Sequence, residues 1–237
     1  TRNVVTMAEK YGVRRFVNIS TDKAVRPSSI MGASKRVGEA LVEAASARAD
    51  DGVCFVSVRF GNVLGSRGSV VPLFNRQIDV GGPVTVTDKD MTRYFMTIPE
   101  AVNLVIHAAC LTTGDDLYML QMGEVVRIID LAERMIRMRG LRPYLDIPIQ
   151  FTGVRPGEKL HEELHTQDED TLPTPHPEIV QLAARRNGLE PDSFLARVEY
   201  LLERGFGEGD ALAQLQELIY SAEAVECPVR EPATSAI

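Results

Sequence analysis

The sequence predicts an α/β fold in which helices cover both faces of a parallel sheet. Helix-like and strand-like segments alternate through residues 1–60, and the connections between them are short. The segment VCFVSVRF (53–60) is an almost continuous apolar run, as expected for a strand that is buried on both faces. Ligands of such sheets bind at the carboxyl ends of the strands, which here are the residues from Ser20 and from Phe60 onward.

The elements are justified in order by their patterning. Apolar residues at helical spacing, closed by Gly12, predict a first helix. The β-rich RRFVNIS follows as a strand, and an alanine-rich helix then leads to the strand at 53–60. Pro99 suits the first turn of a helix, and Gly140 suits the end of one. The expected helices and strands of the first sheet are 1–12, 14–20, 31–49 and 53–60.

The remaining chain is divided by its composition. Loop, short helix and short strand are expected at 61–98, and IPIQFTGVRPGEKLHEELH should give a strand, a turn and a helix. Prolines and acids at 166–178 indicate a linker. Helices are expected at about 99–112, 127–140, 191–204 and 210–221, and a strand in DLYMLQMG. The predicted regions are 1–80 with the sheet and its turn, 81–165 for ligand binding, 166–225 as linker and helical extension, and 226–237 as a tail.

Composition narrows the class of function. The chain has 237 residues with a formal net charge of -7, and its arginines are scattered, which argues against nucleic acid and anionic lipid as partners. The longest apolar run, 101–111, is shorter than the roughly 20 residues that span a bilayer. Cys54, Cys110 and Cys227 are too few for a disulfide framework. We therefore predict a cytoplasmic segment without membrane contact.

A polar cluster, Ser20, Thr21, Asp22 and Lys23, follows the first strand. An acid beside an amine at the mouth of a parallel sheet is suited to general acid and base catalysis, because each group shifts the proton affinity of the other. A solvated turn with an Asp cap is the structural alternative, since turns are often built from Ser, Thr and Asp.

The next helix carries a second pattern. Met31 and Lys35 lie one turn apart and share a face, and the small residues between them leave room for a flat ligand. The pair resembles the Tyr-x-x-x-Lys pair of the short-chain dehydrogenases, with Met31 in the place of the tyrosine. In that superfamily the lysine binds the nicotinamide ribose.

Longer motifs make the resemblance more specific. FVNISTDKAVRPSSIMGASKRVGE, RFGNVLGSRGSVVPLF, GGPVTVTDKDMTRYFMTIPEAV and GVRPGEKLHEEL follow one another over roughly residues 1–165. Together they resemble the nucleotide-sugar 4,6-dehydratases of polysaccharide biosynthesis, the CapD-like branch of the extended short-chain dehydrogenases in which methionine replaces the tyrosine. The resemblance implies the C-terminal part of a Rossmann-like doubly wound sheet, with a smaller α/β region that binds a UDP-sugar.

The resemblance also implies a reaction. NAD takes a hydride from sugar C4 and returns it to C6, while water is eliminated across C5 and C6. By analogy Asp22 is the acid and Lys23 the base, and the C4 hydroxyl proton passes through Thr21, Asp22 or a water, because Met31 has none to exchange. A lysine base needs its neutral form, which desolvation or a nearby cation such as Lys35 would favour. Ser20, Met31 and Lys35 would contact the cofactor.

Substrate contacts are implied in the same way. Asn62 would lie near the sugar and diphosphate, and Val71 beside the base. Arg93 and Arg155 would bind the diphosphate through their forked guanidinium groups, and Glu158 would accept a hydrogen bond from the nucleotide ribose. UDP-N-acetylglucosamine is the expected substrate, and a homo-oligomer the expected assembly.

Two other motifs carry less weight. GNVLGSRG (61–68) lacks the G-x-G-x-x-G spacing of a dinucleotide loop. HEELH (161–165) matches the zinc pattern H-E-x-x-H, but TQDEDTLPTP follows at once and no third ligand is evident, so no metal is predicted.

The glycine-rich turn that holds the NAD pyrophosphate in the resembled enzymes has no counterpart in this sequence. We therefore expect the chain to be the C-terminal part of a longer enzyme, often membrane-anchored in this branch, and to show neither firm NAD affinity nor turnover alone. Two alternatives remain: a UDP-sugar 4-epimerase, and a non-catalytic sugar-nucleotide-binding or scaffold module. An upstream glycine-rich turn would favour an enzyme.

Overall fold

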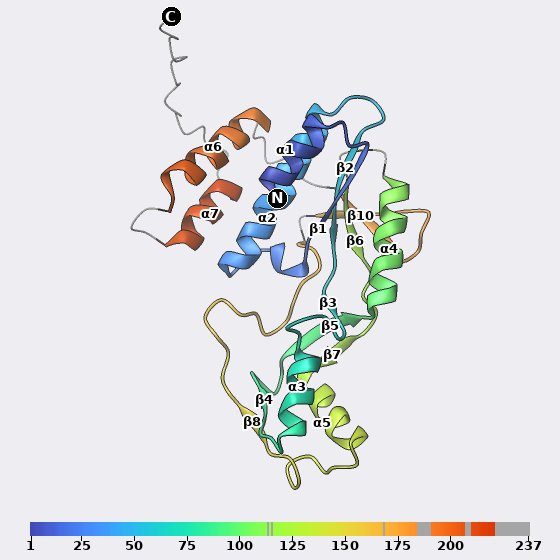
Figure 1. Ribbon diagram of the computed structural model, residues 1–237, viewed down its shortest axis with the longest axis vertical. Helices are drawn as coiled ribbons and strands as arrows, with labels where there is room; N and C mark the ends of the chain where they lie inside the picture. Colours follow the sequence, from blue (N-terminus) through green and yellow to red (C-terminus); the bar gives the residue numbers. More distant parts are fainter. Residues whose placement is uncertain (113, 115, 168, 184–190, 207–209, 221–237) are drawn as a thin grey trace, which may run out of the picture.

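The computed structural model describes residues 1–112, 114, 116–167, 169–183, 191–206 and 210–220 (Figure 1). The predicted tail at 226–237 and Cys227 lie outside these residues.

A five-stranded sheet confirms the predicted α/β fold class. Its strand order is β1-β2-β6-β10-β9. The strands β1, β2 and β6 run parallel, whereas β10 pairs antiparallel with β6 and with β9. All six residues of β2 are buried, as its apolar run predicts. The strands are β1 (Arg15–Ile19), β2 (Cys54–Arg59), β6 (Asp116–Leu120), β9 (Asp170–Pro173) and β10 (Ile179–Ala183).

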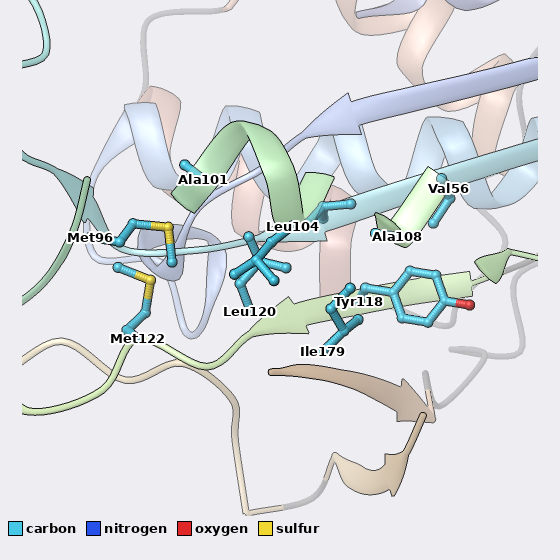
Figure 2. Packing of buried hydrophobic residues seen from close by; sticks show 10 residues of the cluster. Val56, Met96, Ala101, Leu104, Ala108, Tyr118, Leu120, Met122 and Ile179 are labelled. Carbon is cyan, nitrogen blue, oxygen red and sulfur yellow. The ribbon is translucent and has the colours of Figure 1, made fainter. Parts of the chain in front are cut away.

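Helices cover both faces of this sheet. On one face, α1 (Arg2–Lys10) and α2 (Ile30–Arg48) enclose Phe55 of β2 in a buried cluster. On the other face, α4 (Ile98–Leu111) packs on the next residues of β2, in the cluster shown in Figure 2. The alternation of neighbouring β2 side chains between the two clusters follows from the pleat of a strand.

A helical pair covers the outer side of α2. The helices α6 (Pro191–Arg204) and α7 (Ala211–Tyr220) coincide closely with the two helices expected from the sequence. They bury small and branched residues of α2 against their own apolar stripes, and Figure 1 shows both beside α2. The buried cluster consists of Ala33, Val37, Leu41, Phe194, Val198, Leu215, Leu218 and Ile219.

A second region, at the bottom of Figure 1, has its own core and two small sheets. One sheet joins β3 (Asn62–Val63), β5 (Thr92–Met96) and β7 (Val125–Arg127), and the other joins β4 (Val84–Val86) to β8 (Ile149–Phe151). The helices α3 (Val70–Asp79) and α5 (Ile128–Met138) pack on them. Residues 98–120, which form α4 and β6, return to the first sheet.

Two expectations for the chain after β8 are wrong. Residues 158–165 do not form a helix, because the carbonyl oxygens of Lys159 and Leu160 accept hydrogen bonds from Arg93 rather than from a following helical turn. The predicted linker contains β9, which pairs with β10 at the edge of the sheet. Its terminal Pro173 is compatible with an edge position, where the missing N–H is not needed.

Among the described residues, no helix is long and apolar enough to cross a bilayer.

Candidate active site

The polar cluster after β1 forms a short turn at the carboxyl end of the sheet. Asp22–Ala24 make a single 3-10 turn, η1, and the hydroxyl of Thr21 caps it by accepting from the backbone N–H of Lys23 (3.4 Å). The same hydroxyl donates to Asp22 Oδ1 at 2.8 Å. The N–H groups of Ser20 and Asp22 donate to the carbonyl oxygens of Val58 and Phe60. The turn is therefore fixed to β2 as well as to β1.

The first turn of α2 packs directly on this turn. The hydroxyl of Ser29 caps the helix by accepting from the N–H of Gly32 at 3.2 Å. A Cβ atom at Gly32 would lie 2.2 Å from the carbonyl oxygen of Lys23. At Gly32, one of the small residues expected to leave room for a flat ligand, the space that a side chain would fill is thus occupied by the backbone of Lys23.

The ammonium of Lys23 lies between two buried carboxylates. Its Nζ is 2.9 Å from Asp22 Oδ1 and 3.4 Å from Glu162 Oε1. The amide oxygen of Asn62 lies 3.4 Å from the same Nζ. Asp22 Oδ2 and Glu162 Oε2 are buried without a hydrogen-bond partner among the described residues. The site therefore concentrates negative charge around one amine.

Lys35 does not supply the cation expected beside Lys23. Its own ammonium is exposed and donates to the carbonyl oxygen of Ile19 at 3.1 Å. The neighbours of the Lys23 amine in the described chain are oxygen atoms, two of them carboxylate oxygens.

The segment that carries Arg155 and Glu158 is held against the loop before α2. Lys159 Nζ donates to the carbonyl oxygen of Val25 at 2.8 Å, and the Ser28 hydroxyl donates to that of Gly157 at 2.8 Å. Arg93 is buried and donates to the carbonyl oxygens of Thr92 (2.7 Å), Lys159 (2.9 Å) and Leu160 (3.1 Å). These bonds fix one wall of the site relative to the other.

Between these walls lies a pocket of about 300 Å³. It brings together five of the residues singled out from the sequence, although they come from three separate stretches of chain. Arg155 is exposed in the pocket, and the Glu158 side chain is 29% exposed, so both have atoms available to a ligand. The five residues are Lys23, Met31, Arg93, Arg155 and Glu158.

The other predicted residues lie around the pocket rather than in its lining. Asp22 and Asn62 contact Lys23, which lines the pocket, and Thr21 is hydrogen-bonded to Asp22. The hydroxyl of Ser20 is buried and donates to Glu39. Val71, in the first turn of α3, and Lys35 are not among the lining residues. The roles of all these residues stay predictions.

A buried ion pair behind the turn was missed. Arg59, at the end of β2, donates through Nε and Nη2 to both carboxylate oxygens of Glu39 (2.7 and 2.8 Å), and through Nη1 to Glu169 at 2.8 Å. Burial raises the pKa of the Glu39 carboxyl, but the charge and hydrogen bonds of Arg59 outweigh it and leave that pKa below its usual value. An arginine closing an apolar strand was the available signal, because buried charges are paired.

Glu162 was also missed as a site residue. It lines the pocket and is 8% exposed. In the sequence it was part of HEELH, whose histidines point to other partners: His161 Nδ1 lies 2.8 Å from Thr92 Oγ1, and His165 Nδ1 lies 2.9 Å from the Thr166 carbonyl oxygen. No group of three or more His, Cys, Asp or Glu side chains that could hold a metal occurs among the described residues.

The family model described as polysaccharide biosynthesis protein matches residues 1–184. The chain belongs to this family. The match covers the first sheet, the pocket and the second region, and it ends before α6. The family resemblance that the motifs predicted is therefore confirmed.

Two curated relatives of this polysaccharide biosynthesis chain have names of different kinds. The capsular polysaccharide biosynthesis protein CapD of Staphylococcus aureus is 54% identical over 71% of this chain and 28% of its own length. A UDP-glucose 4-epimerase of Rickettsia canadensis is 38% identical over 70% of this chain and 48% of its own length. The chain thus spans less than half of each of these two relatives.

Solved structures agree on the fold. Pen from Bacillus thuringiensis superposes with a TM-score of 0.71 at 36% identity, over 78% of this chain and 57% of that one. A UDP-glucose 4-epimerase of Thermus thermophilus, solved in complex with NAD, gives 0.60 at 23% identity, over 68% of this chain and 58% of that one. The predicted Rossmann-like fold class is confirmed.

Proposed function

We propose that this chain carries the catalytic turn and the substrate pocket of a nucleotide-sugar 4,6-dehydratase that acts on UDP-N-acetylglucosamine with NAD as cofactor. The observation that carries the proposal is one pocket in which the Asp22–Lys23 pair meets two arginines, Arg93 and Arg155. An acid–base pair suits an elimination, and arginines suit a diphosphate.

The two arginines differ in what they offer a diphosphate. Arg93 is buried and donates to three carbonyl oxygens of the protein, whereas Arg155 is exposed in the pocket. We therefore assign the larger share of diphosphate binding to Arg155, and to Arg93 the additional task of holding the segment at 159–160. Glu158 would accept from the nucleotide ribose, with Asn62 at the sugar and Val71 beside the base.

The acid and base roles can be explained by the transfer of one proton from Lys23 to Asp22. Lys23 Nζ lies 2.9 Å from Asp22 Oδ1, which is hydrogen-bonding distance. Transfer of one proton along this contact breaks an N–H bond and forms an O–H bond, leaving a neutral amine and a carboxylic acid. The amine can then take the C5 proton, and the acid can protonate the departing hydroxyl. Thr21, which donates to the same oxygen, would relay the C4 hydroxyl proton.

The residues present fit one end of NAD. Met31 lines the pocket and is 49% exposed, and Lys35 lies one turn further along α2 with an exposed ammonium suited to ribose hydroxyls. Ser20 fits less well, because its hydroxyl is already bound to Glu39. NAD, when bound, supplies the hydride transfers of the reaction. The sequence has no G-x-x-G-x-x-G turn, so we place the pyrophosphate contacts outside this chain.

A UDP-sugar 4-epimerase is the second candidate, supported by the relative of that name at 38% identity. It requires no acid and base for an elimination, so the buried Asp22–Lys23 pair favours the dehydratase. A non-catalytic sugar-nucleotide-binding module is the third candidate, and it predicts binding without product. A cytoplasmic location and a homo-oligomeric assembly stay predictions.

Product analysis of the complete protein tests these candidates. Incubation with UDP-N-acetylglucosamine should give a 4-keto product lacking one water, identified by mass spectrometry and NMR. Asp22→Asn and Lys23→Ala should each lower turnover by about 100-fold or more, since general acid–base groups contribute about that factor, while UDP still binds. A 4-epimer as sole product would establish the second candidate, and UDP-sugar binding with no product would establish the third.

A further inference from the structure

Glu162 has an environment that its neighbours in HEELH lack. Its side chain is 3% exposed, and its Oε1 lies between two cations, 3.4 Å from Lys23 Nζ and 3.7 Å from Arg93 Nε. Glu163, the next residue, has a side chain that is 40% exposed and pairs with Arg26 at the surface. Two adjacent and chemically identical residues are thus placed in opposite surroundings.

Burial of the Glu162 carboxylate at this position is unfavourable in free energy. A charged side chain loses its hydration on burial, and Glu162 Oε2 has no hydrogen-bond partner among the described residues to replace it. What the group does offer is a second anchor for Lys23, whose four-carbon stem is flexible and whose side chain is 27% exposed. Asp22 holds the amine from the turn, and Glu162 holds it from the opposite wall of the pocket.

We infer that Glu162 is a positioning residue for Lys23. It keeps the amine between Asp22 and the bound sugar, so that Lys23 can give its proton to Asp22 and take the C5 proton with a fixed geometry. The inference rests on the proposed function for its effect on turnover, but the hold on Lys23 exists without substrate. Misplacement of a reacting group by about 1 Å can lower a rate by about 100-fold, so the second anchor has a large effect if it acts in this way.

The first experiment needs no substrate. The lysines of the chain are acylated with acetic anhydride at low stoichiometry, and the rate at Lys23 is measured by mass spectrometry relative to Lys35, which pairs with neither glutamate. In Glu162→Gln the neutral amide no longer pairs with the ammonium, and labelling of Lys23 should rise at least 3-fold. Glu163→Gln is the matched control and should leave the Lys23 ratio unchanged. An unchanged ratio in Glu162→Gln overturns the inference.

The second experiment separates positioning from folding. In the complete protein, Glu162→Gln should lower kcat about 10-fold to 100-fold with KM for UDP-N-acetylglucosamine within about 3-fold, and Glu162→Asp, which keeps the charge, should recover part of kcat. Glu163→Gln should behave as the unsubstituted protein. Parallel losses of kcat, UDP binding and thermal stability in Glu162→Gln would mean a purely structural role and would overturn the inference.

The two experiments also distinguish the inference from the proposed function. If the unsubstituted protein forms no product from UDP-N-acetylglucosamine, the dehydratase proposal fails, while the acylation ratio still decides whether Glu162 holds Lys23. If product forms but neither Lys23 labelling nor kcat responds to Glu162→Gln, the dehydratase stands and the inference is wrong.

Discussion

The backbone of Lys23 leaves no room for a side chain at Gly32. A Cβ atom there would lie 2.2 Å from the Lys23 carbonyl oxygen, closer than any real contact, so Gly32→Ala must displace the turn that carries Asp22 and Lys23. We expect a loss of about 1–3 kcal/mol in the free energy of unfolding, measured with urea, and a fall in turnover larger than this loss explains.

Gly38, in the same helix, provides the control. The three atoms nearest to a Cβ atom there belong to the Thr1 side chain, with Oγ1 at 3.1 Å, and the backbone of Gly38 has helical geometry. Because alanine is favoured over glycine in a helix by about 1 kcal/mol, Gly38→Ala should leave stability equal or higher. If both substitutions behave alike, helix propensity rather than the contact with Lys23 governs Gly32.

Residue types in the sequence predicted which side chains take part in catalysis, but not which atoms surround these side chains. Asp22 and Lys23 were found because an acid, an amine and hydroxyls follow a strand. Glu162 was not found, because its role depends on a contact across 139 positions of chain that no local period encodes. Lys35 was suggested, beside desolvation, as a cation that could favour a neutral Lys23, and its ammonium donates to the carbonyl oxygen of Ile19.

At the scale of elements, one buried ion pair joins α2 to β2. Glu39 is 3% exposed and Arg59 1% exposed, and removing one partner of such a pair leaves the other charge buried with less compensation; without the Glu39 charge, Arg59 keeps its contact with Glu169 at 2.8 Å. Glu39→Gln should therefore lower the free energy of unfolding at pH 7 by about 3–5 kcal/mol. Glu199→Gln, which breaks an exposed pair with Arg2, should lower it by less than about 1 kcal/mol.

The pH dependence of the same pair has a definite sign. The folded-state pKa of Glu39 is lowered, so its stabilisation is complete above the unfolded-state pKa of about 4.3 and is lost as pH falls through the lower folded-state value. Urea midpoints of the unsubstituted chain and of Glu39→Gln should therefore converge over the pH range below about 4.3. A stability difference that stays constant over this range would refute the assignment.

Helices and buried strands were predictable where one period dominates a long segment. α6 was expected at the residues where it forms, and α5 ends at Met138, just before Gly140, whose φ of 74° suits a glycine. The hairpin of β9 and β10 was not predictable, because the prolines and acids of 166–178 are typical of loops and because β10 is a strand through its long-range pairing with β6 as well as its pairing with β9. The prediction of a helix at 158–165 was wrong for the opposite reason. The local pattern of this segment is helical, but two of its carbonyl oxygens accept hydrogen bonds from Arg93.

At the scale of the molecule, the pocket depends on contacts between distant regions. One wall belongs to the turn and the start of α2, and the other to the segment after β8, which returns from the second region (Figure 1). The C-terminal helical pair also reaches the site, since Gln216 Nε2 donates to the carbonyl oxygen of Pro27 at 2.9 Å. Ligand binding should therefore depend on the folded chain as a whole rather than on any single helix or strand.

The division of ligands between this chain and the rest of the protein gives the last prediction. The pocket offers two arginines and Glu158 to a UDP moiety, whereas the sequence has no glycine-rich turn for a dinucleotide pyrophosphate. By calorimetry on the 237-residue chain, UDP should bind measurably and NAD at least 10-fold more weakly. Arg155→Ala should weaken UDP binding about 10-fold, because a charge-assisted bidentate contact is lost. Arg137→Ala removes an equally charged side chain that pairs with Glu133 on α5, and it should leave UDP binding unchanged. NAD binding as tight as UDP binding would show that the pyrophosphate contacts lie within this chain, and our assignment of those contacts to residues outside it would then be wrong.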